Sequence, residues 1–189
     1  MRAIAYAVAA ATTLASGAVV AQTSPCTGTG APLENVPVAT LELERYLGQW
    51  HEIAHLPMFF QRKCVSDTTA TYTLKENDRI EVRNACGTKD GSQTESVGEA
   101  KTVDGSPGAL KVRFAPAWLG WVPGIWADYW VLDVDPDYRW AVVGGPSRKY
   151  LWILSRDPGM DAGLFNRLKS DAEARGYDLK DLVVGAPLE

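Results

Sequence analysis

Apolar and polar side chains alternate along Thr68-Thr69-Ala70-Thr71-Tyr72-Thr73-Leu74, and the alternation resumes along Ile80-Glu81-Val82-Arg83. The polar residues Glu76-Asn77-Asp78 separate the two runs. Successive side chains of a strand point to opposite faces, so a period of two on each side of a polar turn is typical of a β-hairpin. This stretch therefore predicts two antiparallel strands, each with one apolar face.

Similar patterns on both sides of the hairpin predict further strands. Some are weak, such as the small residues that alternate at 96–100, and others are clear, such as the apolar and charged residues that alternate at 110–114. Asp-Pro-Asp and Gly-Gly-Pro-Ser turns separate the later runs. The six further strands are expected around Trp50 and at 96–100, 110–114, 128–135, 139–144 and 150–156.

The C-terminal part of the chain has a helical period instead. Apolar residues from Leu164 to Ala172 recur on one helix face, Asp161 is suited to cap its N-terminus, and Gly176 is suited to end it. A short strand is expected at 179–184. Consecutive short strands followed by one helix predict an all-β fold, either an antiparallel barrel or a sandwich. Eight strands can close into a barrel with room for one small ligand.

Composition limits the class of protein. The chain has 189 residues, 46% of them hydrophobic and 22% charged, which suits one globular domain with a buried core. Its net charge of −4 argues against a nucleic-acid partner, because such proteins carry a basic excess or a basic stripe.

The N-terminus has the pattern of a secretory signal peptide. Arg2 precedes an Ala-rich apolar run at residues 3–21 that ends in Val19-Val20-Ala21. A membrane-spanning helix is the alternative, but small polar residues interrupt the run and no basic cluster follows it. We expect a signal peptide over residues 1–21 and, because Thr, Gly and Pro are frequent after it, a flexible segment over residues 22–40.

Export determines how the cysteines are interpreted. Cys64 and Cys86 flank the predicted hairpin, and an oxidising compartment favours a disulfide between them. Cys26 would then be an odd thiol that is acylated, free or paired. Pro25 is a poor fit for lipid attachment, which needs small residues just before the cysteine.

The motif His51-Glu52-Ile53-Ala54-His55 matches H-E-x-x-H, which binds zinc in many metalloproteases when it lies on a helix. No other histidine exists in the sequence, and Pro57 leaves little room for a helix. In a strand the two histidines would lie ~13 Å apart, too far for one metal ion. We expect a strand here, with no catalytic residue, no metal and no cofactor. A zinc-dependent hydrolase stays as an alternative.

Three separated motifs resemble the lipocalin family. Gly48-Gln49-Trp50, followed by His51-Glu52-Ile53-Ala54, is similar to the family's opening motif. Asp135-Pro136-Asp137-Tyr138 is similar to the second signature, and Leu151-Trp152-Ile153-Leu154-Ser155-Arg156 to the third. The bacterial, apolipoprotein D-like subgroup matches best. The resemblance implies an eight-stranded antiparallel up-and-down β-barrel with one C-terminal α-helix, in a domain over residues 41–189.

The resemblance also implies roles for the motif residues. Trp50 is expected to close one end of the barrel, with Arg156 across its ring in a cation–π contact. These two residues are expected to hold the fold and to bind nothing. The complete set of structural signature residues is Gly48, Trp50, Asp135, Tyr138 and Arg156.

Residues that share the apolar face of each strand are expected to face the barrel interior. Glu52 shares its face with Trp50, and a carboxylate buried there would need a partner. A fully packed barrel without a cavity is the alternative. The residues expected to contact a ligand are Glu52, Tyr72, Val82, Val112, Phe114, Trp130 and Trp152.

Two loops are unusually apolar, at residues 56–60 and 118–126, and the resemblance implies that both lie at the open end of the barrel. They suggest an entry portal, a lid, a membrane contact or a protein contact, with a homodimer left open. The residues expected there are Phe59, Phe60, Trp118, Trp121 and Trp126.

The resemblance implies a periplasmic or outer-membrane-associated protein that binds, and carries or stores, a fatty acid, a lysophospholipid or another lipophilic molecule. A structural or partner-binding barrel is the other alternative.

Overall fold

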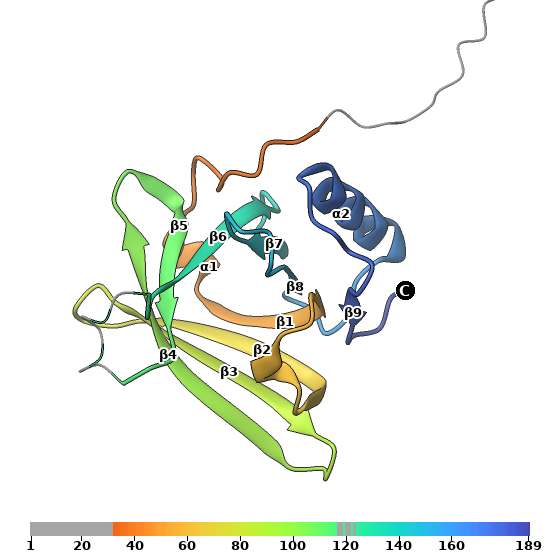
Figure 1. Ribbon diagram of the computed structural model, residues 1–189, viewed down its shortest axis with the longest axis horizontal. Coiled ribbons are helices and arrows are strands. Elements are labelled where there is room, and N and C mark those ends of the chain that lie inside the picture. The colour runs from red at the N-terminus through yellow and green to blue at the C-terminus, as the bar shows by residue number, and fades with distance from the viewer. Residues whose placement is uncertain (1–31, 117–118, 120–121, 123) are drawn as a thin grey trace, which may run out of the picture.

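The computed structural model describes residues 32–116, 119, 122 and 124–189, without the side chain of Phe60 (Figure 1). The predictions for the signal peptide, Cys26, Trp118 and Trp121 lie outside these residues, as does the side-chain prediction for Phe60. Within the described part, no helix is long and apolar enough to cross a membrane.

The described residues form a closed antiparallel barrel. Strand order in the sheet is β2-β3-β4-β5-β6-β7-β8-β1-β9, and β1 also pairs with β2, which closes the barrel with eight strands. The bounds are β1 Gly48–His55, β2 Cys64–Leu74, β3 Ile80–Thr88, β4 Gln93–Val103, β5 Ser106–Arg113, β6 Ala127–Val134, β7 Trp140–Gly144, β8 Trp152–Ser155 and β9 Val183–Val184.

This architecture confirms the predicted fold class. The quoted hairpin is β2 and β3, in which Tyr72 pairs with Val82 and Leu74 with Ile80. The predicted strand at 96–100 is the centre of the longer β4. Of the strand predicted at 179–184, only β9 forms, and it pairs with the end of β1.

Helix α2, Ala162–Ala174, lies against the outside of the barrel (Figure 1). The Asp161 side chain accepts a hydrogen bond from the Leu164 backbone N–H at 2.7 Å, and Gly176 follows the helix at a φ of +89°. Both helix-boundary predictions are therefore confirmed. Two shorter helices are not among the predicted elements, α1 at Leu43–Tyr46 and the 3-10 helix η1 at Phe59–Gln61.

The helix divides the apolar residues into two cores. One core fills the space between the barrel wall and α2, and it includes Ile53, Leu132 and Phe165. The other lies inside the barrel and includes Trp50 and Tyr72. Because α2 covers part of the outer wall, some strands are apolar on both faces.

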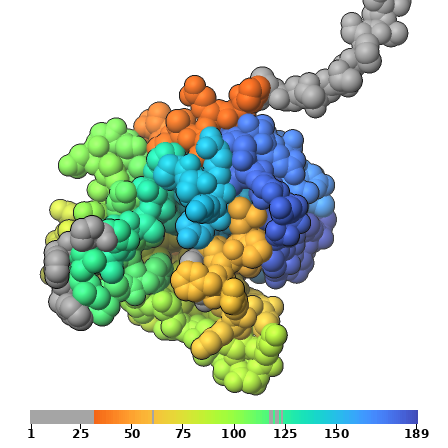
Figure 2. Space-filling view, viewed as in Figure 1, coloured from red at the N-terminus to blue at the C-terminus, as the bar shows by residue number. Residues whose placement is uncertain are grey.

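The segment from residue 33 to residue 38, here called the N-terminal strap, is bound to helix α2 at one end and to β6 at the other. The Leu33 N–H donates to the Ala174 carbonyl at 3.0 Å, and the Val38 N–H donates to the Val131 carbonyl at 2.8 Å. Figure 2 shows orange atoms of this part of the chain beside the blue atoms of the C-terminal part. This corrects the expectation of a flexible segment up to residue 40, because backbone hydrogen bonds hold the strap.

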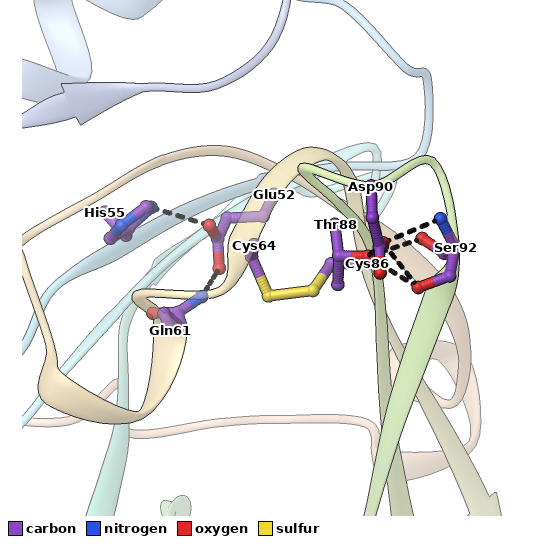
Figure 3. The surroundings of a disulfide bond; sticks show 8 residues. All are labelled: Glu52, His55, Gln61, Cys64, Cys86, Thr88, Asp90 and Ser92. Carbon is purple, nitrogen blue, oxygen red and sulfur yellow. Dashed lines mark hydrogen bonds and ion pairs between the residues drawn. A yellow bond between two sulfur atoms is a disulfide. The ribbon is translucent and has the colours of Figure 1, made fainter.

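The predicted disulfide between Cys64 and Cys86 is present, with the two Cα atoms 5.4 Å apart (Figure 3). It joins the first residue of β2 to β3. Both cysteines also line the cavity described below. The bond therefore fixes one side of the cavity wall.

Candidate ligand-binding cavity

The barrel contains a cavity of about 810 Å³. Side chains of β1 to β6 and of β8 line it, together with residues of η1 and of the segment between β5 and β6. Cavities of about 300–1,000 Å³ that are mostly apolar are typical small-molecule sites. The alternative of a fully packed barrel is therefore wrong for this chain.

Most of the residues expected to contact a ligand are brought together in this cavity. Those that line it are Glu52, Tyr72, Val82, Val112, Phe114 and Trp152. The Phe114 ring lies over Gly98 of β4, where a Cβ atom would come within 2.7 Å of it. Whether these six side chains touch a ligand stays a prediction.

Trp130 is the exception, and the expectation that it faces the interior is wrong. It packs against the core beneath α2, whereas its neighbours Tyr129 and Val131 belong to the interior core. Tyr129 takes the expected place of Trp130 in the cavity wall. The sequence offered two apolar faces on β6, since Trp130 and Leu132 alternate with Tyr129 and Val131. Alternation alone could not identify the inner face.

Three tyrosines meet at the inner end of the cavity. The Tyr46 and Tyr129 hydroxyl oxygens are 2.7 Å apart, and those of Tyr72 and Tyr129 are 2.8 Å apart. Burial raises the pKa of Tyr72 to about 12 and holds the pKa values of Tyr46 and Tyr129 well above their usual value. All three hydroxyls therefore keep their protons at neutral pH. Tyr46 lies in α1, which the sequence did not predict.

Tyr46 also contacts Trp50, which lies at the closed end of the barrel. Trp50 is fully buried, and its indole N–H donates to the Tyr46 carbonyl at 2.8 Å. The Arg156 guanidinium lies 3.7 Å from the centroid of the Trp50 indole and donates to the Gln49 carbonyl at 2.7 Å. The structure therefore has the predicted contact between Arg156 and Trp50.

The remaining signature residues shape the turns at this end. Asp135 is buried in the β6–β7 turn and accepts a hydrogen bond from Arg139 Nε at 2.9 Å. The hydroxyl of Tyr138 accepts one from the Glu42 N–H at 2.8 Å. Gly48 has a φ of +90°, in the left-handed region that favours glycine.

The H-E-x-x-H motif lies in β1 and not on a helix. The Glu52 side chain is 8% exposed, and its carboxylate contacts His55 Nδ1 and Gln61 Nε2, each at 2.7 Å (Figure 3). A bulge between Glu52 and Ala54 brings His55 to this side. No cluster of three potential metal ligands occurs among the described residues.

Of the residues expected at the open end, Phe59 lines the cavity and is 75% exposed. Trp126 does not line the cavity, although its neighbours Ile125 and Ala127 do, and its role in a portal or membrane contact stays a prediction. The centroid of the Trp126 ring lies 4.6 Å from Arg113 Cζ and 4.7 Å from Lys101 Nζ. Lys101 alternates with Ala100 of the interior core, so Trp126 covers the outer face of the barrel.

A second hollow of about 560 Å³ adjoins the mouth and shares Arg62 and Lys63 with the main cavity. Lys89, in the β3–β4 turn, also lines this hollow. Over the described residues, none of these three cations forms an ion pair. The one acidic residue of the hollow is Asp90, whose pKa hydrogen bonds from Thr88 and Ser92 lower to about 2. Lys89 could not be selected from the sequence, because nothing along the chain places it beside η1.

A closed antiparallel barrel with an apolar cavity of this size defines a protein class that holds small molecules inside the barrel. The family model of the Lipocalin-like domain matches residues 41–187. The chain belongs to the lipocalin family.

Named relatives agree with this assignment. Temperature-induced lipocalin-1 of Arabidopsis thaliana is 43% identical over 155 residues, which are 77% of this chain and 78% of that protein. The outer membrane lipoprotein Blc of Escherichia coli K12 is 36% identical and covers 93% of each chain. Apolipoprotein D of Mus musculus is 31% identical over 75% of this chain and 74% of its own.

Solved structures show the same fold at lower identity. The structure of insecticyanin from the tobacco hornworm Manduca sexta superposes with a TM-score of 0.61 at 20% identity, covering 83% of this chain and 86% of that one. The cockroach allergen Per a 4 has a TM-score of 0.61 at 17% identity, covering 84% and 96%.

Proposed function

We propose that this protein binds a single-chain lipid, a fatty acid or a lysophospholipid, and carries or stores it without changing it chemically. The observation that carries the proposal is the cavity of about 810 Å³ inside the barrel. Its wall includes Val82, Val112, Phe114 and Trp152. Burial of an acyl chain against these side chains contributes about 0.8 kcal/mol per methylene group.

The charges around the cavity favour one orientation of the lipid. Arg62, Lys63 and Lys89 lie at the mouth without an ion-pair partner among the described residues. The Glu52 carboxylate lies within the wall of the cavity. An anionic carboxylate or phosphate head group is attracted by the cations at the mouth. Beside the Glu52 carboxylate it would be repelled. We therefore place the head group at the mouth and the chain inside.

The cell envelope is the proposed location, with the protein in the periplasm or associated with the outer membrane. Support comes from the N-terminal pattern of a signal peptide and from the relatives that are named outer membrane lipoproteins. The exposed Phe59 at the mouth is suited to contact a membrane surface.

The structure provides a matched pair of tryptophans to test the ligand site. Trp152 lines the cavity, whereas Trp130 packs on the outer side of the wall. We expect Trp152→Ala to weaken binding of a fluorescent polyene fatty acid at least about tenfold, because a buried aromatic contact is lost. Fluorescence titration gives the Kd of each variant.

Trp130→Ala is the control, because it removes the same side chain without touching the cavity. It is expected to leave the Kd within about twofold while lowering the thermal midpoint, since packing beneath α2 is lost. Equal weakening by both variants, or by neither, would show that the cavity is not the binding site.

A further inference from the structure

The three tyrosine hydroxyls at the inner end of the cavity have more protons to donate than hydrogen bonds among themselves. Each hydroxyl carries one proton, so Tyr46, Tyr72 and Tyr129 hold three. Two contacts connect them, and each contact uses one proton. One O–H is therefore left over, whichever way the two hydrogen bonds are directed.

Among the described residues, these three hydroxyls make no hydrogen bond other than the two contacts with each other. The free O–H can lie on Tyr46, Tyr72 or Tyr129, depending on the direction of the chain. Tyr46 is 1% exposed and does not line the cavity, whereas Tyr72 and Tyr129 do. A buried donor without an acceptor costs about 1–3 kcal/mol, so the arrangements that direct the proton into the cavity are favoured when an acceptor is there.

We propose that Tyr46, Tyr72 and Tyr129 form a hydrogen-bonding subsite that recognises a neutral oxygen acceptor on the inserted end of the bound lipid. This inference rests on the function proposed above and narrows the class of ligand. The acceptor is a keto, ester, ether or hydroxyl oxygen. A lipid that ends in an ordinary methyl group leaves the O–H without a partner.

Charge argues for a neutral acceptor over an anionic one. The three hydroxyls are protonated at neutral pH, and besides burial the nearby Glu52 carboxylate helps to raise the pKa of Tyr72. Glu52 also contacts His55 and Gln61. A second carboxylate beside Tyr72 would be repelled. The anionic head group therefore stays at the mouth, where Arg62 and Lys63 lie.

The test uses two lipids that differ at the inserted end alone. Hexadecanoyl-lysophosphatidylglycerol is compared with its analogue that has a keto group on the penultimate carbon of the chain, by isothermal titration calorimetry. Both lipids have the same bulky head group, which prevents them from entering the cavity head first. We expect the keto lipid to bind about tenfold more tightly, because it supplies the missing acceptor.

Removal of the hydroxyls is expected to abolish the preference. The triple variant Tyr46→Phe, Tyr72→Phe and Tyr129→Phe keeps every ring and should bind both lipids equally, with the methyl-ended lipid bound at least as tightly as by the unaltered protein. If the triple variant does not fold, the double variant at Tyr72 and Tyr129 removes both hydroxyls of the cavity wall. Tyr150→Phe, on the exposed rim, is the matched control and should keep the full preference.

The outcomes separate this inference from the function on which it rests. Equal binding of the two lipids by the unaltered protein would overturn the subsite and leave the lipid-binding proposal standing. A preference that persists in the Phe variant would also overturn it, since the acceptor would then be bound elsewhere. No binding of either lipid would contradict the proposed function itself.

Discussion

At the scale of single residues, Arg156 connects several backbone segments at the closed end. Its Nη2 donates to the carbonyls of Arg45 at 2.8 Å and Leu47 at 2.9 Å, and its Nε donates to the Tyr138 carbonyl at 3.2 Å. The same guanidinium lies across the Trp50 ring. One planar group thus joins the segment before β1 to the β6–β7 turn, a geometry that lysine cannot reproduce.

We expect Arg156→Ala to lower the free energy of unfolding by about 2–3 kcal/mol, because several hydrogen bonds and a cation–π contact are lost together. Arg156→Lys should recover a minor part of the loss. Urea denaturation measures both variants. A loss below about 0.5 kcal/mol for Arg156→Ala would contradict the structural role given to this residue.

Some residues of the site could be predicted from the sequence, and others could not. The alternation in β2, β3 and β5 has one apolar face, so Tyr72, Val82 and Val112 were placed in the cavity wall. Trp130 was misplaced because both faces of β6 are apolar. The contacts of Trp126 with Arg113 and Lys101 could not be predicted, because they join segments far apart in the chain.

At the scale of elements, the Cys64–Cys86 disulfide joins β2 and β3 across a sequence separation of 22 residues. A covalent link of this length restricts the unfolded chain and stabilises the fold by about 3 kcal/mol. We therefore expect the variant with both Cys64→Ala and Cys86→Ala to lose stability of that size, measured as a lower midpoint in urea.

Reduction provides the control for this prediction. The unaltered protein treated with dithiothreitol should unfold at the midpoint of the double variant, and the double variant should not respond to dithiothreitol. An unchanged midpoint of the unaltered protein after complete reduction would show that the bond contributes nothing to stability.

Elements with a clear period were predicted, and elements held by distant partners were not. The β2–β3 hairpin, β5 and α2 have a repeating apolar pattern, and turn residues mark the limits of the later strands. The N-terminal strap has none, and it is ordered because Leu33 and Val38 donate to carbonyls of α2 and β6. Helix α1 has one turn, too short for a period, and its Tyr46 is fixed by contacts with Trp50 and Tyr129.

At the scale of the whole molecule, pairing of β1 with both β2 and β8 closes the sheet and leaves a hollow interior. The number of strands could be predicted from the sequence, whereas the cavity depends on how the side chains divide the interior. Trp50 and Ile80 fill the inner core, and the space beyond Tyr72 and Tyr129 is open to η1. A hollow barrel with a closed end is the feature that the proposed function needs.

The most direct test of whether the hollow barrel holds a lipid is native mass spectrometry of the protein isolated from its own cells without detergent. The account predicts a population whose mass exceeds that of the chain by one lipid, and addition of hexadecanoyl-lysophosphatidylglycerol should convert the remaining protein to a complex with one lipid per chain. A spectrum that shows only the unbound chain, before and after the lipid is added, would contradict it.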